Sequence, residues 1–284
     1  MVQTREIERG ICPTAVTIYS PAANHDRHIA LLYFHGGGLL YGTRNDLPIL
    51  YTEMLLSAGY TLYCFDYPLA PEATIMQIHE NVIEEWRWFI EKEMNEGSLD
   101  EYLLFGRSAG AYLALLLGRS IQNEMNAPQP KGIFVFYGFF DLTQPFFSEP
   151  IAPYSELPVI KKELVDKIVK SSFLTNAPKE LRFSLYVYAR QQGTWLQLLG
   201  LSVEDSMHFS LSAEDIAALP PLFITASTGD EEIPFSESKR LWRASHKAVI
   251  KPVYHLAHDF DRETANHIGQ DIYQYALAWA NQLP

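Results

Sequence analysis

Two glycine-containing motifs, about seventy residues apart, each follow a short apolar run in this chain of 284 residues. The motif HGGG at residues 35–38 follows the apolar run 29–34, and the motif GRSAG at residues 106–110 follows the apolar run 102–105. Apolar runs of this length are typical of buried strands, so each motif is predicted to begin where a strand ends. The pairing indicates main-chain N–H donors from one motif and a serine nucleophile from the other. A plain glycine turn would explain residues 35–38 but not their pairing with the serine motif.

The serine of the second motif, Ser108, is predicted to lie in a sharp strand-to-helix turn. An apolar helix pattern begins at residues 112–117, and glycines at positions 106 and 110 remove Cβ atoms that would collide in such a turn. A helix that starts here directs its free N–H groups and the positive end of its dipole at an oxyanion beside Ser108. A serine-capped helix after a glycine turn is the alternative interpretation of this motif taken alone.

A serine nucleophile needs a base, and the base needs a carboxylate that orients it. The predicted strand over 221–226 is followed by the polar turn 227–230, which places Asp230 just beyond the strand. Asp230 is therefore the candidate acid, because the turn presents it before Glu231 and Glu232. The alternative is a solvated acidic cluster at the start of a helix.

Two histidines compete for the role of base after the predicted strand 249–254. His258 is preferred because it lies farther along, in a polar loop that can reach over the edge of the sheet, whereas His255 belongs to the strand end and is interpreted as structural. His255, His258, Asp259 and Asp261 include ligand types that suit zinc, but no HExxH or CxxC frame accompanies them. We therefore expect no metal, and acyl transfer by a serine, a histidine and an acid needs no cofactor.

Strand and helix patterns alternate along most of the remaining chain. Strands are predicted at 61–65 and 132–137, and helices are predicted at 74–94 and 262–282. Such alternation builds a mostly parallel sheet with helices on both faces, so the predicted fold class is α/β.

The alternation breaks between residues 140 and 215, where helical patterns at 160–172 and 177–200 follow a proline-containing stretch. We therefore divide the chain into a first core part over 1–139, a lid insertion over 140–215 and a second core part over 216–284. The insertion precedes the strand that carries the acid, so it is expected to lie over the strand ends and to shape the substrate pocket. Four of its residues are candidates either to line this pocket or to pack the lid against the core: Tyr186, Tyr188, Arg190 and Trp195.

Taken together, these motifs resemble the hormone-sensitive-lipase-like branch of the α/β-hydrolases, which includes many microbial carboxylesterases. The matching features are HGGG at 35–38 with Gly42, DYPLAPE at 66–72, GRSAG at 106–110, Asp230 and His258. The likeness runs from about residue 29 to the C-terminus and is weakest between about 140 and 215. It implies an α/β-hydrolase fold with a small helical lid, and it makes DYPLAPE a structural segment near the active site.

The resemblance implies a serine carboxylesterase that hydrolyses small soluble carboxylic esters through an acyl-enzyme. Ser108 would attack the ester, His258 would accept its proton, and Asp230 would orient the imidazole. The implied oxyanion donors are the N–H groups of Gly36, Gly37 and Ala109. A serine peptidase or amidase on the same fold is one alternative, and a non-catalytic ligand-binding module is another.

One departure from that branch lies beside the nucleophile, where a usually acidic position is occupied by Arg107. A cation here either favours anionic or strongly polar substrates or pairs with a neighbouring carboxylate. The structural pairing is the favoured interpretation, and on the other one Arg107 is a candidate substrate-binding residue.

Composition argues against several other classes of protein. The 22 Lys and Arg residues against 34 Asp and Glu give a net charge of −12, which disfavours nucleic acids and anionic membrane surfaces as partners. No apolar run approaches the roughly 18 to 20 residues of a membrane span. Residues 1–9 lack the apolar stretch of a signal peptide, so we expect a cytoplasmic protein, and Cys12 and Cys64 make no disulfide framework. The expected partner is a small-molecule ester, and a homodimer is left open.

Overall fold

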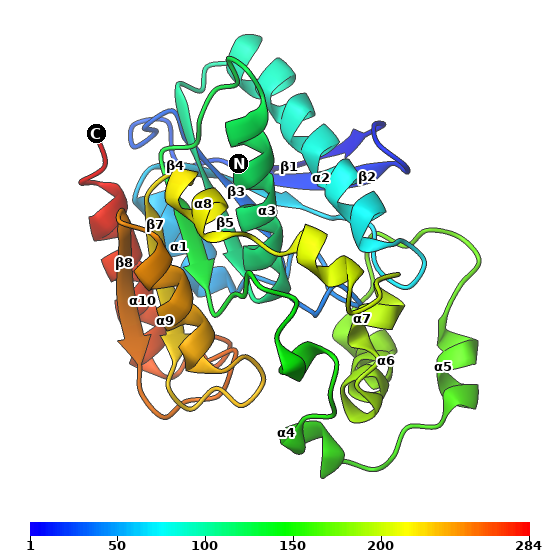
Figure 1. Cartoon of the computed structure of the whole chain (residues 1–284). Coiled ribbons are helices and arrows are strands. Elements are labelled where there is room, and N and C mark those ends of the chain that lie inside the picture. Colours follow the sequence, from blue (N-terminus) through cyan, green and yellow to red (C-terminus); the bar gives the residue numbers. More distant parts are fainter.

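Eight strands form one sheet in the computed structural model, which describes residues 1–284 (Figure 1). The strands are β1 (Val2–Ile7), β2 (Thr14–Tyr19), β3 (Ile29–Phe34), β4 (Tyr60–Phe65), β5 (Glu101–Arg107), β6 (Ile133–Phe136), β7 (Leu222–Ser227) and β8 (Ala248–Val253). Their order is β1-β2-β4-β3-β5-β6-β7-β8. The strands from β3 to β8 are parallel to one another, whereas β1 and β2 pair in antiparallel fashion. The carboxyl ends of the parallel strands therefore share one edge of the sheet, where α/β proteins place their ligands.

Helices cover both faces of this sheet. The α-helices are α1 (Ile49–Ser57), α2 (Ile75–Phe89), α3 (Ala109–Asn123), α4 (Ala152–Ser155), α5 (Lys162–Ile168), α6 (Lys179–Gln192), α7 (Trp195–Leu198), α8 (Ala213–Ala218), α9 (Phe235–Ala244) and α10 (His267–Ala280). On one face Leu32 and Phe34 share a core with α2, α3 and α9, and on the other Leu31 and Tyr33 share a core with α1 and α10. Burial on both faces explains why β3 reads as one continuous apolar run. None of the helices is both long and apolar enough to cross a bilayer.

The predicted strands are found within about two residues of their expected bounds, and the predicted fold class is confirmed. The helix expected over 74–94 begins at Ile75, because the side chains and main-chain N–H groups of Thr74 and Gln77 satisfy one another in a capping box. It continues as a π-helical turn, Ile90–Asn95.

Three other helix predictions are too long. The helix expected over 160–172 is found only as α5, Lys162–Ile168. The helix expected over 177–200 is interrupted at Gly193, whose φ of 64° is left-handed, so α6 and α7 are separate helices. The helix expected over 262–282 starts later, where the Asn266 side chain caps the first turn of α10. The strands β1 and β2 were not predicted, and β1 is exposed along most of its length, so it carries no apolar run.

The segment between β6 and β7 carries α4 to α8, and Figure 1 shows α4 to α7 grouped together to one side of the sheet. Glu72, the last residue of DYPLAPE, fastens this segment to the core. Its carboxylate accepts hydrogen bonds from Arg182 of α6 at 2.7 and 3.1 Å and from the N–H of Lys170 at 2.8 Å. Arg182 also donates to the carbonyl of Ala70 at 2.8 Å, and the Arg182 and Glu72 side chains are only 3% and 1% exposed. The motif therefore anchors the inserted helices.

Candidate active site

Ser108 stands at the junction of β5 and α3, with φ of 53° and ψ of −120°. A positive φ is strained for a residue with a side chain, and such strain is concentrated at functional sites. Close packing around the turn requires the neighbouring glycines: a Cβ on Gly106 would lie 2.2 Å from the carbonyl carbon of Gly110. A Cβ on Gly110 would lie 2.0 Å from the carbonyl oxygen of Phe34 in β3. The glycines thus allow a turn that holds the serine hydroxyl at the carboxyl end of β5.

The structure brings Ser108, His258 and Asp230 into one hydrogen-bonded chain. Nε2 of His258 lies 2.8 Å from Oγ of Ser108, and Nδ1 lies 2.6 Å from Oδ2 of Asp230. Because an ionised carboxylate only accepts, Nδ1 carries the proton and Nε2 of the neutral ring is free to accept from the serine hydroxyl. The other oxygen of Asp230 accepts from the N–H groups of Glu232 and Ile233, both at 2.9 Å, which fixes the carboxylate. His255, by contrast, is exposed, and only its main-chain N–H makes a hydrogen bond, which it donates to the Thr228 hydroxyl at 3.2 Å.

The surroundings of His258 favour its protonated form. Burial disfavours the imidazolium, but the charges of Asp230 and Glu232 outweigh burial and raise the pKa of His258 to about 9. A base with a raised pKa accepts the serine proton readily once it is neutral, and its imidazolium is stabilised when it forms.

The glycine run at residues 36–38, which follows β3, lies directly against the turn that carries Ser108. A Cβ on Gly36 would lie 3.2 Å from the carbonyl oxygen of Arg107 and 3.4 Å from Cβ of Ser108. The run is held in place by the Tyr67 hydroxyl, which donates to the carbonyl of His35 at 2.8 Å. The N–H groups of Gly36, Gly37 and Ala109 donate to no protein acceptor. They are therefore free to receive an anionic oxygen beside Ser108.

Arg107 is buried and paired. Its Nη2 lies 2.8 Å from Oδ1 of Asp261 and its Nη1 lies 3.4 Å from Oδ2 of Asp46. Its Nε donates to the Tyr137 hydroxyl at 2.6 Å, and that hydroxyl donates to Asp261 at 2.7 Å. Of the two interpretations of Arg107, the structure shows the pairing with neighbouring carboxylates.

The cavity next to Ser108 has a volume of about 70 Å³. This is small beside the roughly 300–1,000 Å³ of typical small-molecule sites. Ser108 and His258 line it together with residues 36–38 and Arg107. A second cavity of about 170 Å³ shares part of the same wall, including Gly36 and Lys179. The cavity beside Ser108 therefore adjoins a larger one.

Of the four lid residues expected to line the pocket, only Tyr186 does so. Tyr188, Arg190 and Trp195 do not line it, and they follow the other alternative, in which they pack the lid. Trp195 is buried, stacks on Phe147 and donates from its indole nitrogen to the carbonyl of Gly38 at 2.8 Å. Tyr188 follows Tyr186 by two positions and so points about 200° away around the helix, where it packs half-buried against the core.

Arg190 is buried beneath the cavity wall and does not line it. Its guanidinium lies 5.9 Å from the ring centroids of Phe147 and Tyr186, and it donates to the carbonyl of Glu232 at 3.4 Å. It therefore supports the wall from behind.

Several lining residues were missed by sequence reasoning. The missed residues are Tyr41, Asp46, Tyr137, Tyr154, Lys179, Phe183, Glu232, Asp259 and Arg262. A helical spacing could have found some of them, because Lys179 and Phe183 lie seven and three positions before Tyr186 on one face of α6. Tyr137 follows β6 directly, at the same edge of the sheet as Ser108.

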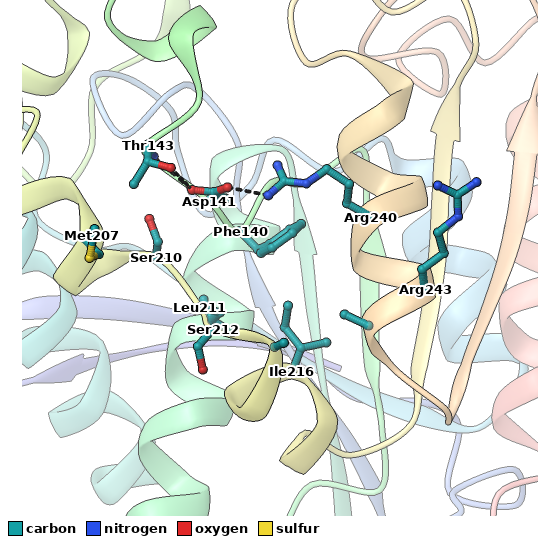
Figure 2. A pocket seen from close by; sticks show the side chains of 12 residues that line it. Phe140, Asp141, Thr143, Met207, Ser210, Leu211, Ser212, Ile216, Arg240 and Arg243 are labelled. Carbon is teal, nitrogen blue, oxygen red and sulfur yellow. Dashed lines mark hydrogen bonds and ion pairs between the residues drawn. The ribbon is translucent and has the colours of Figure 1, made fainter.

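A cavity of about 600 Å³, larger than the one beside Ser108, lies elsewhere. Figure 2 shows it between α8, α9 and the loop after β6, with Arg240 directed towards Asp141. Nη2 of Arg240 lies 2.5 Å from Oδ2 of Asp141. This cavity contains neither Ser108 nor His258, and its walls combine apolar side chains with this ion pair. The chemistry of a nucleophile and its base is therefore confined to the smaller cavity. No group of three or more His, Cys, Asp or Glu side chains is placed to hold a metal ion.

Comparison with known proteins places this chain in a family. Residues 31–261 match the family described as alpha/beta hydrolase fold. A solved structure of an alpha/beta hydrolase superfamily protein from Enterococcus faecalis is 32% identical, with a TM-score of 0.87 over 99% of this chain and 98% of that one. The chain belongs to the α/β-hydrolases, in their hormone-sensitive-lipase-like branch.

Two curated relatives match parts of the chain. Ethyl acetate hydrolase of Pseudomonas putida is 30% identical over 103 residues, which cover 35% of this chain and 32% of the hydrolase. Non-reducing polyketide synthase adrD of Penicillium rubens is 32% identical over 141 residues, which cover 46% of this chain but only 6% of the synthase. The match thus spans a small part of the synthase and about a third of the hydrolase. The chain is therefore similar in part to an ester hydrolase of this fold.

Proposed function

We propose that this protein is a serine carboxylesterase that hydrolyses small soluble esters through an acyl-enzyme. The observation that carries the proposal is the hydrogen-bonded chain from Ser108 through His258 to Asp230, with distances of 2.8 and 2.6 Å. A nucleophile, a base in the correct tautomer and an orienting acid are the groups that acyl transfer requires.

In the first step, Oγ of Ser108 attacks the ester carbonyl carbon while its proton passes to Nε2 of His258. The carbonyl oxygen becomes negative and is received by the N–H groups of Gly36 and Gly37 and of the residue after the serine. Fixed donors that meet a developing charge in a water-poor site lower the barrier strongly. Collapse of the tetrahedral species breaks the bond to the alcohol, which leaves with the proton from His258.

In the second step, a water molecule gives its proton to His258 and attacks the acyl carbon. The carboxylic acid is released and the proton returns to Ser108. Asp230 holds the imidazole in one orientation and stabilises its charged form in both steps.

The volume of about 70 Å³ supports a preference for short acyl groups or small alcohols. Part of the cavity wall comes from α6, which the Arg182 and Glu72 pair fastens to the core. A fixed wall limits how far the cavity can widen for a longer chain.

The proposal is tested with aryl esters of graded acyl length, assayed with wild type and Ser108→Ala. We expect the highest kcat/KM for the shortest acyl groups and a loss of at least about 10⁴-fold in the variant. An anilide hydrolysed as fast as the matching ester would assign an amidase instead. No hydrolysis of any ester, together with no labelling of Ser108 by a fluorophosphonate, would assign a binding protein.

A further inference from the structure

The charged groups of the catalytic cavity do not all neutralise one another. Three acids and three cations line it: Asp46, Glu232, Asp259, Arg107, Lys179 and Arg262. Asp46 pairs with Arg107 at 3.4 Å, and Asp259 pairs with Arg262 at 2.6 Å. Glu232 makes no ion pair within 4 Å, so in the active enzyme, in which His258 is neutral, it is the acid of the cavity that lacks a cationic partner.

Glu232 is held in place inside the cavity. Its N–H donates to Asp230 at 2.9 Å, and its Oε2 accepts from the Tyr186 hydroxyl at 3.1 Å. The residue is half-buried, so water solvates its carboxylate only in part. A partly desolvated charge with neutral partners costs free energy that a bound cation recovers.

Aromatic rings form the wall beside this carboxylate. The ring centroids of Tyr41 and Tyr154 lie 5.9 and 5.4 Å from that of Tyr186, and all three residues line the cavity. Burial and the charge of Glu232 raise the pKa of Tyr41 above its ordinary value, so these hydroxyls stay neutral. The faces of neutral aromatic rings attract ammonium groups.

Another aromatic ring of the cavity, that of Phe183, already holds an ammonium. Nζ of Lys179 lies 4.5 Å from the ring centroid of Phe183, at the rim that the two cavities share. Lys179 repels a second cation at Phe183. Arg190 lies in the same way 5.9 Å from the ring centroid of Tyr186. The place left for a substrate cation is the part of the wall formed by Tyr41 and Tyr154, next to Glu232.

We propose that the ester substrate carries an ammonium group, which Tyr41 and Tyr154 receive and Glu232 neutralises. This inference rests on the proposed esterase function and adds the chemical class of the substrate. The ammonium belongs either to the acyl part or to the alcohol part of the ester, and the two give different results in the experiment below.

The experiment compares esters that differ only in charge. For the alcohol part, the acetate of choline is paired with 3,3-dimethylbutyl acetate, in which carbon replaces the charged nitrogen. For the acyl part, the ethyl ester of trimethylglycine is paired with ethyl 3,3-dimethylbutanoate. In one of the two pairs we expect kcat/KM to be about tenfold higher for the cationic ester at a single pH.

Two variants separate the role of Glu232 from a general change in activity. Glu232→Gln keeps the shape and removes the charge, so the ratio between cationic and neutral ester should fall towards one. Glu231→Gln, an exposed neighbour outside the cavity, is the matched control and should leave the ratio unchanged. Using a ratio cancels any effect of Glu232 on the base, because both esters need the same base.

Equal rates for cationic and neutral esters in both pairs would overturn the inference while leaving the esterase function intact. A preference for the acetate of 3-hydroxypropanoate, lost in Lys179→Gln, would also overturn it and assign an anionic substrate. No hydrolysis of any ester and no fluorophosphonate labelling of Ser108 would instead overturn the esterase function on which the inference rests.

Discussion

Removing the charge of Asp261 tests how the two halves of the site are held together. The side chains of Asp261 and Arg107 are 0% and 2% exposed and lie 2.8 Å apart. Breaking a buried ion pair costs about 3–5 kcal/mol, because the remaining charge stays buried without its partner. In Asp261→Asn, Arg107 still has Asp46 at 3.4 Å, so we expect a loss at the lower end, about 3 kcal/mol.

Urea unfolding of wild type and Asp261→Asn measures this loss as a lower midpoint and a lower free energy of unfolding. The control is Asp166→Asn, which removes an ion pair with Lys162 whose side chains are 57% and 69% exposed. The control should unfold like wild type, because exposed ion pairs contribute little. A free energy of unfolding for Asp261→Asn within about 0.5 kcal/mol of wild type would refute the reasoning.

The same pair has a consequence for turnover. Arg107 directly precedes Ser108, and Asp261 lies three residues after His258, so the pair joins the serine turn to the histidine loop. Under conditions where Asp261→Asn is folded, we expect kcat to fall by about tenfold or more, with a smaller change in KM. An unchanged kcat would show that the pair stabilises the fold without positioning the base.

Three further predictions concern single residues. The kcat/KM should be low at neutral pH and rise as His258 loses its proton near pH 9. In Glu232→Gln the midpoint of this pH profile should move to lower pH, because the charge of Glu232 helps to raise the pKa of His258. An unmoved midpoint would contradict that role of Glu232. Gly36→Ala should lower kcat about a hundredfold, because the new methyl group displaces an N–H donor of the oxyanion. The free energy of unfolding in urea should stay nearly unchanged. Full activity of the variant would argue against Gly36 as a donor. Glu72→Gln should lower the free energy of unfolding in urea by about 3 kcal/mol, because Arg182 loses its buried partner. Proteolysis of the helices between β6 and β7 should become faster. An unaltered digest would contradict the anchoring of these helices by Glu72.

The position of the site could be predicted because each of its three residues follows a recognisable segment of the sequence. Ser108, Asp230 and His258 each follow a segment that the sequence predicts as a strand, and parallel strands bring such ends to one edge. The glycines beside Ser108 revealed the sharp turn, because only a residue without Cβ fits there.

The lining of the cavity could not be predicted in the same way. Which face of α6 lines the cavity depends on how that helix packs. The sequence therefore could not show that Tyr186 lines the cavity and Tyr188 does not. The partners of Arg107 have no local signal either, because Asp261 lies 154 positions away in the chain. Contacts of this kind are set by the folded structure as a whole.

The central claim, that Ser108 carries the acyl group, is tested most directly by trapping the intermediate. The enzyme is quenched with acid during steady-state turnover of an aryl acetate, and its peptides are analysed by mass spectrometry. The account predicts an added acetyl group on the peptide that contains Ser108, and none in Ser108→Ala. Continued hydrolysis with the acetyl group on another residue, or with undiminished turnover in Ser108→Ala, would contradict it.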